Sequence, residues 1–228
     1  MTDTATPIRA ALIDLDGTLV DTLGDFTFAL NLMMADLGLG QLTPTQVQDC
    51  IGRGSEHLIR AALGVQMPKA PKDQIDSLYP RAWERYQDHY RRHNGQNAQV
   101  YPGVAEGLRH MKQRGWALAC VTNKPAEFAR TLLHNVGLAP YFTQVTGGDS
   151  YPRKKPDPMP LLKTCELLDA APEQALMIGD SVYDAHAAKA AGCPLVLVTY
   201  GYHHQAPLHQ LGALQCVDRL DALAFDTL

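Results

Sequence analysis

Hydrophobic and polar positions along the chain predict strands and helices that follow one another. Short apolar runs, typical of buried strands, occur at residues 8–15, 116–122, 144–146, 175–178 and 194–199. After the first of these runs, apolar residues recur at helical spacing in four segments, 104–114, 126–136, 158–168 and 182–191. Three of the four end at a glycine, which is a helix stop signal. This alternation predicts an α/β fold with a parallel sheet, whose active site lies at the carboxyl ends of the strands.

The segment from residue 21 to residue 96 has a different pattern. It contains amphipathic helical stretches and no convincing strand; the stretches are 26–37, 45–51, 56–63 and 73–92. Trp83, Tyr86 and Tyr90 recur at helical spacing in the last of them, and we expect them to pack in the interior of this segment. We therefore predict a core domain formed by residues 1–20 and 97–228, with a helical domain, residues 21–96, inserted after the first strand.

Composition narrows the classes of function. A length of 228 residues suits one large domain with an insert, and the net charge of -4 argues against a nucleic-acid partner. The apolar runs are too short to span a bilayer, and the first residues lack the pattern of a signal peptide, so we expect no membrane partner. The five cysteines are scattered and include no C-x-x-C pair, which favours reduced thiols and a cytoplasmic protein.

Polar residues gather where the predicted strands end. The four groups are Asp14-Leu15-Asp16-Gly17-Thr18, Thr122-Asn123-Lys124-Pro125, Lys154-Lys155-Pro156 and Gly179-Asp180-Ser181 with Asp184. In a parallel sheet such ends can converge on one crevice. Residues two apart in a strand share a face, so the carboxyl groups of Asp14 and Asp16 leave on the same side. Two carboxylates there are explained by a hard cation, or by one attacking an electrophile while the other moves a proton.

This combination of residue types fits phosphoryl transfer. A bound Mg²⁺ screens the substrate's charge from an attacking carboxylate, which would form an aspartyl-phosphate. A hydroxyl, an amide and the N–H groups of a helix N-terminus can bind the phosphoryl oxygens, and a lysine can neutralise them.

The four groups match the four motifs of the haloacid dehalogenase superfamily, and the chain resembles its phosphoglycolate phosphatase branch over most of its length. The resemblance implies a Rossmann-like, mostly parallel sheet with helices on both faces and an inserted α-helical cap. It also implies a Mg²⁺-dependent phosphatase for a small-molecule phosphate ester, with 2-phosphoglycolate as the leading substrate. Sugar phosphates, phosphosugar acids and pyrophosphate stay open as substrates, as does a mutase that passes the phosphoryl group to a sugar. A non-enzymatic module phosphorylated on Asp14 is disfavoured, because it should lack Asp16 or Lys155.

The resemblance implies roles for individual residues as well. Asp14 would be the nucleophile and Asp16 the general acid and base, with Lys155 as the catalytic lysine of the third motif. Mg²⁺ would bind the side chains of Asp14 and Asp180 and the backbone carbonyl of Asp16.

Other residues are expected to bind the substrate or to support the site. Thr122 and Asn123 would bind phosphate together with Lys155, and Arg53, in the Gly52-Arg53-Gly54 loop of the insert, would meet a substrate carboxylate. Supporting roles fall to Thr18, Ser181 and Asp184. Lys124 could face either solvent or substrate, and the chain could be a monomer or a homodimer.

Overall fold

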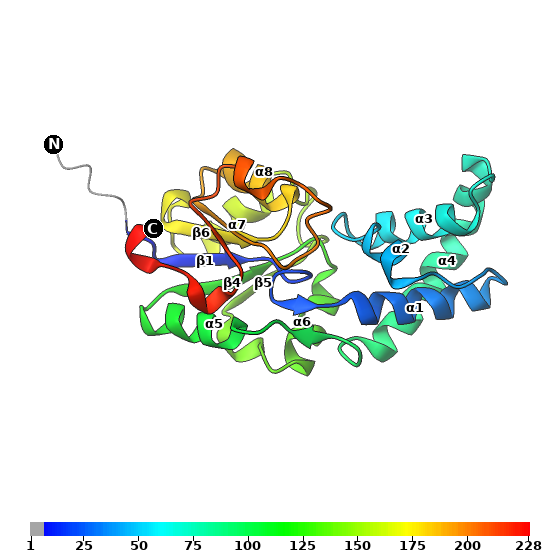
Figure 1. The fold of residues 1–228 in the computed structure, drawn as a ribbon, viewed down its shortest axis with the longest axis horizontal. Coiled ribbons are helices and arrows are strands. Elements are labelled where there is room, and N and C mark those ends of the chain that lie inside the picture. The colour runs from blue at the N-terminus through cyan, green and yellow to red at the C-terminus, as the bar shows by residue number, and fades with distance from the viewer. Residues whose placement is uncertain (1–6) are drawn as a thin grey trace.

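A six-stranded parallel sheet forms the centre of the computed structural model, which describes residues 7–228 (Figure 1). Residues 1–6, where we expect no signal peptide, lie outside this range. The strand order is β5-β4-β1-β6-β7-β8. The bounds are β1 Ala10–Ile13, β4 Ala117–Val121, β5 Gln144–Thr146, β6 Ala175–Gly179, β7 Leu195–Val198 and β8 Gln215–Val217. The predicted α/β class is confirmed.

Alternate residues of each strand face the two layers of helices that cover the sheet. Ala11 and Ile13 of β1 pack in one hydrophobic cluster with residues of α5 (Val104–Gln113) and α6 (Ala126–Asn135). Ala10 and Leu12 pack in a second cluster with α7 (Met159–Leu167) and α8 (Val182–Ala191). Because both faces are buried, the central strands consist of continuous apolar runs.

Several short strands and helices were not predicted from the sequence. The edge strand β8 is partly exposed and has no apolar run, and two two-residue strands lie outside the main sheet. Five short 3-10 helices complete the core: Ala139–Tyr141, Pro172–Gln174, Leu208–Gln210, Leu220–Ala222 and Phe225–Thr227. No helix among the described residues is long and apolar enough to cross a membrane.

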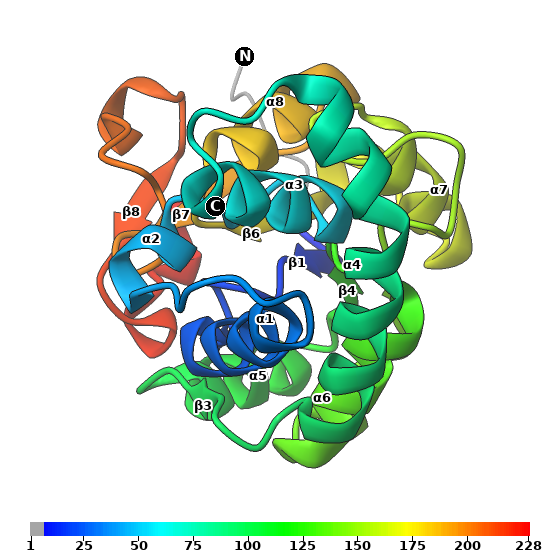
Figure 2. The ribbon, with the colours of Figure 1, turned by 90° about the vertical axis from the view of Figure 1, so that its right-hand side faces the viewer.

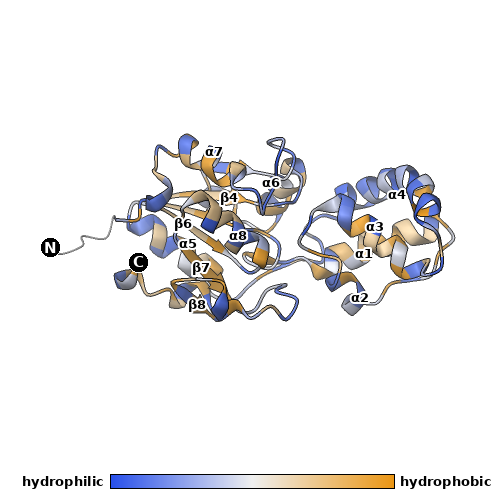
Figure 3. Cartoon of the chain, turned by 90° about the horizontal axis from the view of Figure 1, so that it is seen from above, coloured by the Kyte–Doolittle hydropathy of each residue, from blue (hydrophilic) through white to orange (hydrophobic). Residues whose placement is uncertain are grey.

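Helices α1 to α4 form a separate layer beyond the carboxyl ends of the strands (Figures 1 and 2). Their bounds are α1 Leu23–Asp36, α2 Pro44–Gln48, α3 Ser55–Gln66 and α4 Lys72–His93. They share a hydrophobic cluster of their own, in which Tyr86 and Tyr90 are fully buried and Trp83 is partly buried. Figure 3 shows this unit, the helical cap, beside the sheet. Packing of the three aromatic residues within the cap was expected from their spacing.

Two chain crossings join the cap to the core, and they lie side by side. Strand β2 (Val20–Asp21) leaves the core and pairs antiparallel with the returning strand β3 (Gln99–Val100). The carboxylate of Asp25, at the start of α1, accepts hydrogen bonds from the backbone N–H groups of Gly95 (2.6 Å) and Asn97 (2.8 Å). Neither β2 nor β3 was predicted from the sequence, because a two-residue strand leaves no periodic pattern.

Candidate active site

A cavity opens between the carboxyl ends of the central strands and the cap. Figure 2 looks from the cap side toward these strand ends. Asp14 directly follows β1, Thr122 follows β4 and Asp180 follows β6. Of the residues predicted to form a site, all except Thr18 and Arg53 line this cavity. The fold therefore brings most of the four polar groups into one place, as the parallel sheet predicted.

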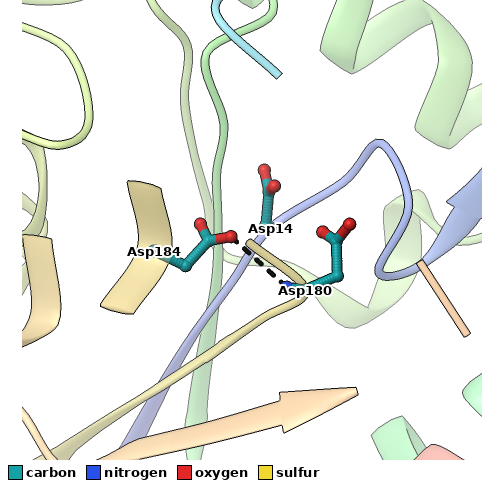
Figure 4. A group of neighbouring side chains, drawn as sticks. All are labelled: Asp14, Asp180 and Asp184. Atoms are coloured by element: carbon teal, nitrogen blue, oxygen red, sulfur yellow. Dashed lines mark hydrogen bonds between the residues drawn. The ribbon is translucent and has the colours of Figure 1, made fainter. Parts of the chain in front are cut away.

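Three buried carboxyl groups form the centre of the cavity. Asp14, Asp180 and Asp184 each offer an oxygen atom, and these atoms lie within 4.8 Å of one another (Figure 4). Burial raises the pKa of Asp14 to about 6, and the raising effect of Asp184 adds to it while Lys155 opposes it. Burial, followed by repulsion from Asp184 and Asp14, also raises the pKa of Asp180 well above its ordinary value. Clustered, desolvated oxygen donors of this kind suit a hard divalent cation.

Lys155 compensates part of this negative charge. Its ammonium group is almost fully buried and lies 2.7 Å from Asp184 Oδ1, 2.9 Å from Asp14 Oδ1 and 2.7 Å from the backbone oxygen of Val121. Burial alone would lower the pKa of Lys155, but the two carboxylates outweigh it and raise that pKa above its ordinary value. Lys155 is therefore cationic, with hydrogen bonds to Asp184 Oδ1 and Val121 O and an ion pair with Asp14.

Asp184 and Thr18 fix the geometry of the cluster. Asp184 Oδ2 accepts hydrogen bonds from Ser181 Oγ (2.7 Å), from the Ser181 N–H (3.1 Å) and from the Asp180 N–H (3.3 Å; dashed in Figure 4). Thr18 Oγ1 donates to Asp180 Oδ1 at 2.8 Å from outside the cavity. These contacts are consistent with the supporting positions predicted for Thr18, Ser181 and Asp184.

Asp16 lines the same cavity but does not belong to the cluster of three carboxylates. Its Oδ1 atom accepts a 2.7 Å hydrogen bond from Lys124 Nζ, and this ammonium group lies 4.3 Å from the centre of the Phe26 ring and 5.0 Å from that of Tyr90, both in the cap. Lys124 is only 4% exposed, so of the two orientations left open by the sequence, the solvent-facing one is wrong. The two aspartates thus have different partners, since Asp16 pairs with Lys124 and Asp14 pairs with Lys155.

Thr122 and Asn123 line the cavity where β4 ends. Thr122 Oγ1 accepts a hydrogen bond from the Lys124 N–H at 3.2 Å. The amide nitrogen of Asn123 donates to the backbone oxygens of Gly52 (3.1 Å) and Lys155 (3.0 Å), so it ties the cap loop to the core. Phosphate binding by these two residues stays a prediction.

Arg53 lies outside the cavity. It is exposed, its guanidinium carbon lies 5.8 Å from the centre of the Tyr183 ring, and it lines a neighbouring groove with His57 and His204. The structure therefore does not bring Arg53 together with the aspartates, although its loop borders the cavity through Gly52 and Gly54.

Tyr202 is a cavity residue that the sequence analysis missed. Its backbone N–H donates to Asp180 Oδ2, and its hydroxyl donates to Asp21 Oδ1 at 2.6 Å. The same hydroxyl accepts from the N–H groups of Thr22 (2.8 Å) and Leu23 (3.0 Å). No motif marks this tyrosine, because its partners lie far away in sequence.

Comparison with known proteins agrees with this geometry. Residues 11–198 match the model of the family described as haloacid dehalogenase-like hydrolase. A protein of Thiobacillus denitrificans named phosphoglycolate phosphatase is 42% identical over 205 residues, which cover 90% of this chain and 89% of the relative. One of Cupriavidus necator, named phosphoglycolate phosphatase, plasmid, is 42% identical over 223 residues, or 98% of this chain and 94% of the relative.

A solved structure gives the same result at the level of the fold. The crystal structure of a predicted phosphoglycolate phosphatase from Haemophilus somnus has a TM-score of 0.87 and 31% sequence identity, and covers 95% of this chain and 96% of that one. Its similarity extends over the cap as well as the sheet, since nearly the whole chain is covered.

Proposed function

Because the chain belongs to the haloacid dehalogenase-like hydrolase family, we propose that it hydrolyses 2-phosphoglycolate to glycolate and phosphate. The names of relatives that are 42% identical support this substrate. The observation that carries the proposal is Asp14, which follows β1 at the floor of a capped cavity with Lys155 Nζ 2.9 Å away. A carboxylate held beside a buried cation can approach a phosphoryl group without prohibitive repulsion.

In the first half of the reaction, a carboxylate oxygen of Asp14 attacks the phosphorus atom. With a pKa of about 6, this group is mostly ionised at neutral pH and therefore nucleophilic. The bond between phosphorus and the ester oxygen breaks, and an aspartyl-phosphate forms on Asp14. Lys155 offsets the charge that accumulates around the transferred group.

Asp16 is placed to handle the protons. Lys124 occupies its Oδ1 atom, so Oδ2 is the oxygen that can carry a proton to the departing alkoxide. In the second half, the ionised Asp16 takes a proton from water as that water attacks phosphorus. The bond between phosphorus and Asp14 then breaks, which releases phosphate and restores the nucleophile.

We propose Mg²⁺ as the cofactor. The side chains of Asp14 and Asp180 and the backbone carbonyl of Asp16 would hold the ion, and Asp184 would orient its water shell. The oxygen donors of Asp14, Asp180 and Asp184, all within 4.8 Å of one another, fit such a cation. When bound, the ion supplies electrostatic stabilisation of negative charge on the phosphoryl oxygens.

The roles that we propose for the other polar residues and for the cap depend on where they border the cavity. Thr122, Asn123 and Ser181 border the space where the phosphoryl oxygens would lie, and the cap would exclude water from it. We propose that the protein works in the cytoplasm as a monomer or homodimer; its five unpaired cysteines are consistent with a reducing compartment.

The test is phosphate release from a panel of esters by the purified protein. We expect turnover of 2-phosphoglycolate with Mg²⁺, loss of turnover with EDTA, and loss of at least about 1,000-fold in kcat for Asp14→Asn, because the covalent route is removed. Turnover that survives EDTA, or an Asp14→Asn variant with full activity, would refute the mechanism. A sugar phosphate, phosphosugar acid or pyrophosphate that exceeds 2-phosphoglycolate about tenfold in kcat/KM would refute the substrate.

A further inference from the structure

Lys124 places a second ammonium group in the cavity, on the side that faces the cap. Among the described residues, the cations that line the cavity are Lys124 and Lys155. Lys155 Nζ donates hydrogen bonds to Val121 O and Asp184 Oδ1 and forms an ion pair with Asp14 Oδ1 at 2.9 Å. The acidic cluster and the end of β4 therefore already surround this ammonium group.

Lys124 is in a different position. Within residues 7–228 its one hydrogen-bond acceptor is Asp16 Oδ1, at 2.7 Å, although an ammonium group has three N–H donors. Its other close neighbours are the rings of Phe26 and Tyr90, at 4.3 and 5.0 Å from Nζ to the ring centres. Ring faces attract a cation but do not replace an anionic acceptor. A buried ammonium group therefore keeps donor capacity toward the cavity.

The position of these remaining N–H groups of Lys124 limits which atoms of a bound ligand they can reach. Under the proposed mechanism, Asp16 must reach the ester oxygen to protonate the leaving group, and Lys124 Nζ lies 2.7 Å from Asp16. A group bound by the other N–H donors of Lys124 can then lie one or two carbon atoms from that ester oxygen. In 2-phosphoglycolate a single methylene carbon separates the ester oxygen from the carboxylate.

We propose that Lys124 selects phosphate esters whose alcohol part carries a carboxylate next to the ester carbon. The inference rests on the proposed phosphatase function and deepens it. One N–H of Lys124 stays on Asp16 while the others bind the substrate carboxylate. The cap rings of Phe26 and Tyr90 cover the ammonium group and keep water away, which strengthens a charge-assisted hydrogen bond.

The experiment compares two substrates of nearly equal shape, 2-phosphoglycolate and its neutral amide, 2-phosphoglycolamide. For the wild-type protein with Mg²⁺, we expect kcat/KM to favour the carboxylate by about 10- to 100-fold. Lys124→Met keeps most of the side-chain length and removes the charge. It should bring this ratio close to one, whereas Lys124→Arg should keep a preference for the carboxylate. If the variant also disturbs Asp16, kcat/KM falls equally for both substrates, and the ratio of the two values does not change.

Two further variants serve as comparisons. Lys112→Met removes an exposed lysine on α5 and should leave the ratio unchanged. Arg53→Met tests the rival assignment: a ratio that collapses in this variant but survives in Lys124→Met would overturn the inference. An equal loss on both substrates in Lys124→Met would also overturn it, because Lys124 would then serve Asp16 alone.

The wild-type protein provides a measurement that does not depend on the folding of any variant. A wild-type ratio below about threefold would overturn the inference while leaving the phosphatase function intact. Wild-type protein that hydrolyses no phosphate ester would instead refute the proposed function, and this inference with it.

Discussion

Gly17 sits where a single methyl group would collide with the acidic cluster. It has a positive φ of +90°, and a Cβ atom there would lie 2.5 Å from Asp180 Oδ2 and 2.8 Å from Tyr202 Cδ2. Neither neighbour can move freely, because Thr18 Oγ1 and the Tyr202 N–H both donate hydrogen bonds to the Asp180 carboxylate. Gly17→Ala therefore tests how firmly the structure holds Asp180.

The expected magnitude has two parts. A left-handed backbone conformation costs a residue with a Cβ about 1–2 kcal/mol, and this part applies at any such glycine. Forcing a methyl group into a packed site costs about a further 1–3 kcal/mol. We expect Gly17→Ala to lower the free energy of unfolding by about 2–5 kcal/mol and to weaken Mg²⁺ binding, since Asp180 must shift.

Gly115→Ala is the matched control. Its φ is +79°, but no atom of the residues that the structure describes lies within 4 Å of the added Cβ, so only the cost of the backbone conformation should appear. Urea unfolding in EDTA measures stability without the metal, and calorimetric titration measures Mg²⁺ affinity. If the two variants lost equal stability and both bound Mg²⁺ like the wild type, the reasoning about Asp180 would be refuted.

Three further predictions address the charges and the link between cap and core. Because the pKa of Asp14 is raised to about 6, a proton competes with Mg²⁺ for this carboxylate below that pH. Titration calorimetry should therefore find Mg²⁺ binding about tenfold weaker at pH 5 than at pH 7, and equal affinity at the two pH values would contradict this. Lys155→Met leaves the acidic cluster without its cation, so urea unfolding in EDTA should show that the free energy of unfolding falls by about 3–5 kcal/mol. A fall of less than about 1 kcal/mol would argue against this stabilising role of Lys155. Tyr202→Phe removes the hydrogen-bond acceptor of the Thr22 N–H, so hydrogen exchange at Thr22 should accelerate while exchange in β1 stays unchanged. Protection of Thr22 as in the wild type would count against this role.

The sequence was most informative where burial is complete. Central strands that are covered on both faces appear as apolar runs, so the runs at residues 8–15 and 175–178 located β1 and β6 to within about two residues. Polar residues that follow such runs mark the edge where a site can form. The predicted positions of Asp14, Thr122 and Asp180 at that edge followed from this reasoning.

The spacing of hydrophobic and polar residues could not predict where individual side chains of the site point. Lys124 and Asp16 are 108 residues apart, and the hydroxyl of Tyr202 contacts Asp21 across 181 residues, so neither pairing leaves a local signal. Arg53 lies in a loop whose glycines border the cavity, yet its side chain follows the neighbouring groove. Such outcomes depend on how the cap rests on the core, which no periodicity encodes.

The paired crossings β2 and β3 have a consequence for how this architecture can diversify. Both ends of the insert leave the core as neighbours, with Val20 opposite Val100 and Asp21 opposite Gln99. A foreign segment grafted at this ribbon would begin and end at the same spot, whatever its length, and would not disturb the parallel sheet. The insert also has a hydrophobic cluster of its own. Of the described residues of the core, Phe128 and Tyr202 are the two that are buried in it. The paired strands β2 and β3 thus make the cap an exchangeable module. Lys124 belongs to the core, so it would be retained and would face any cap that replaced the present one.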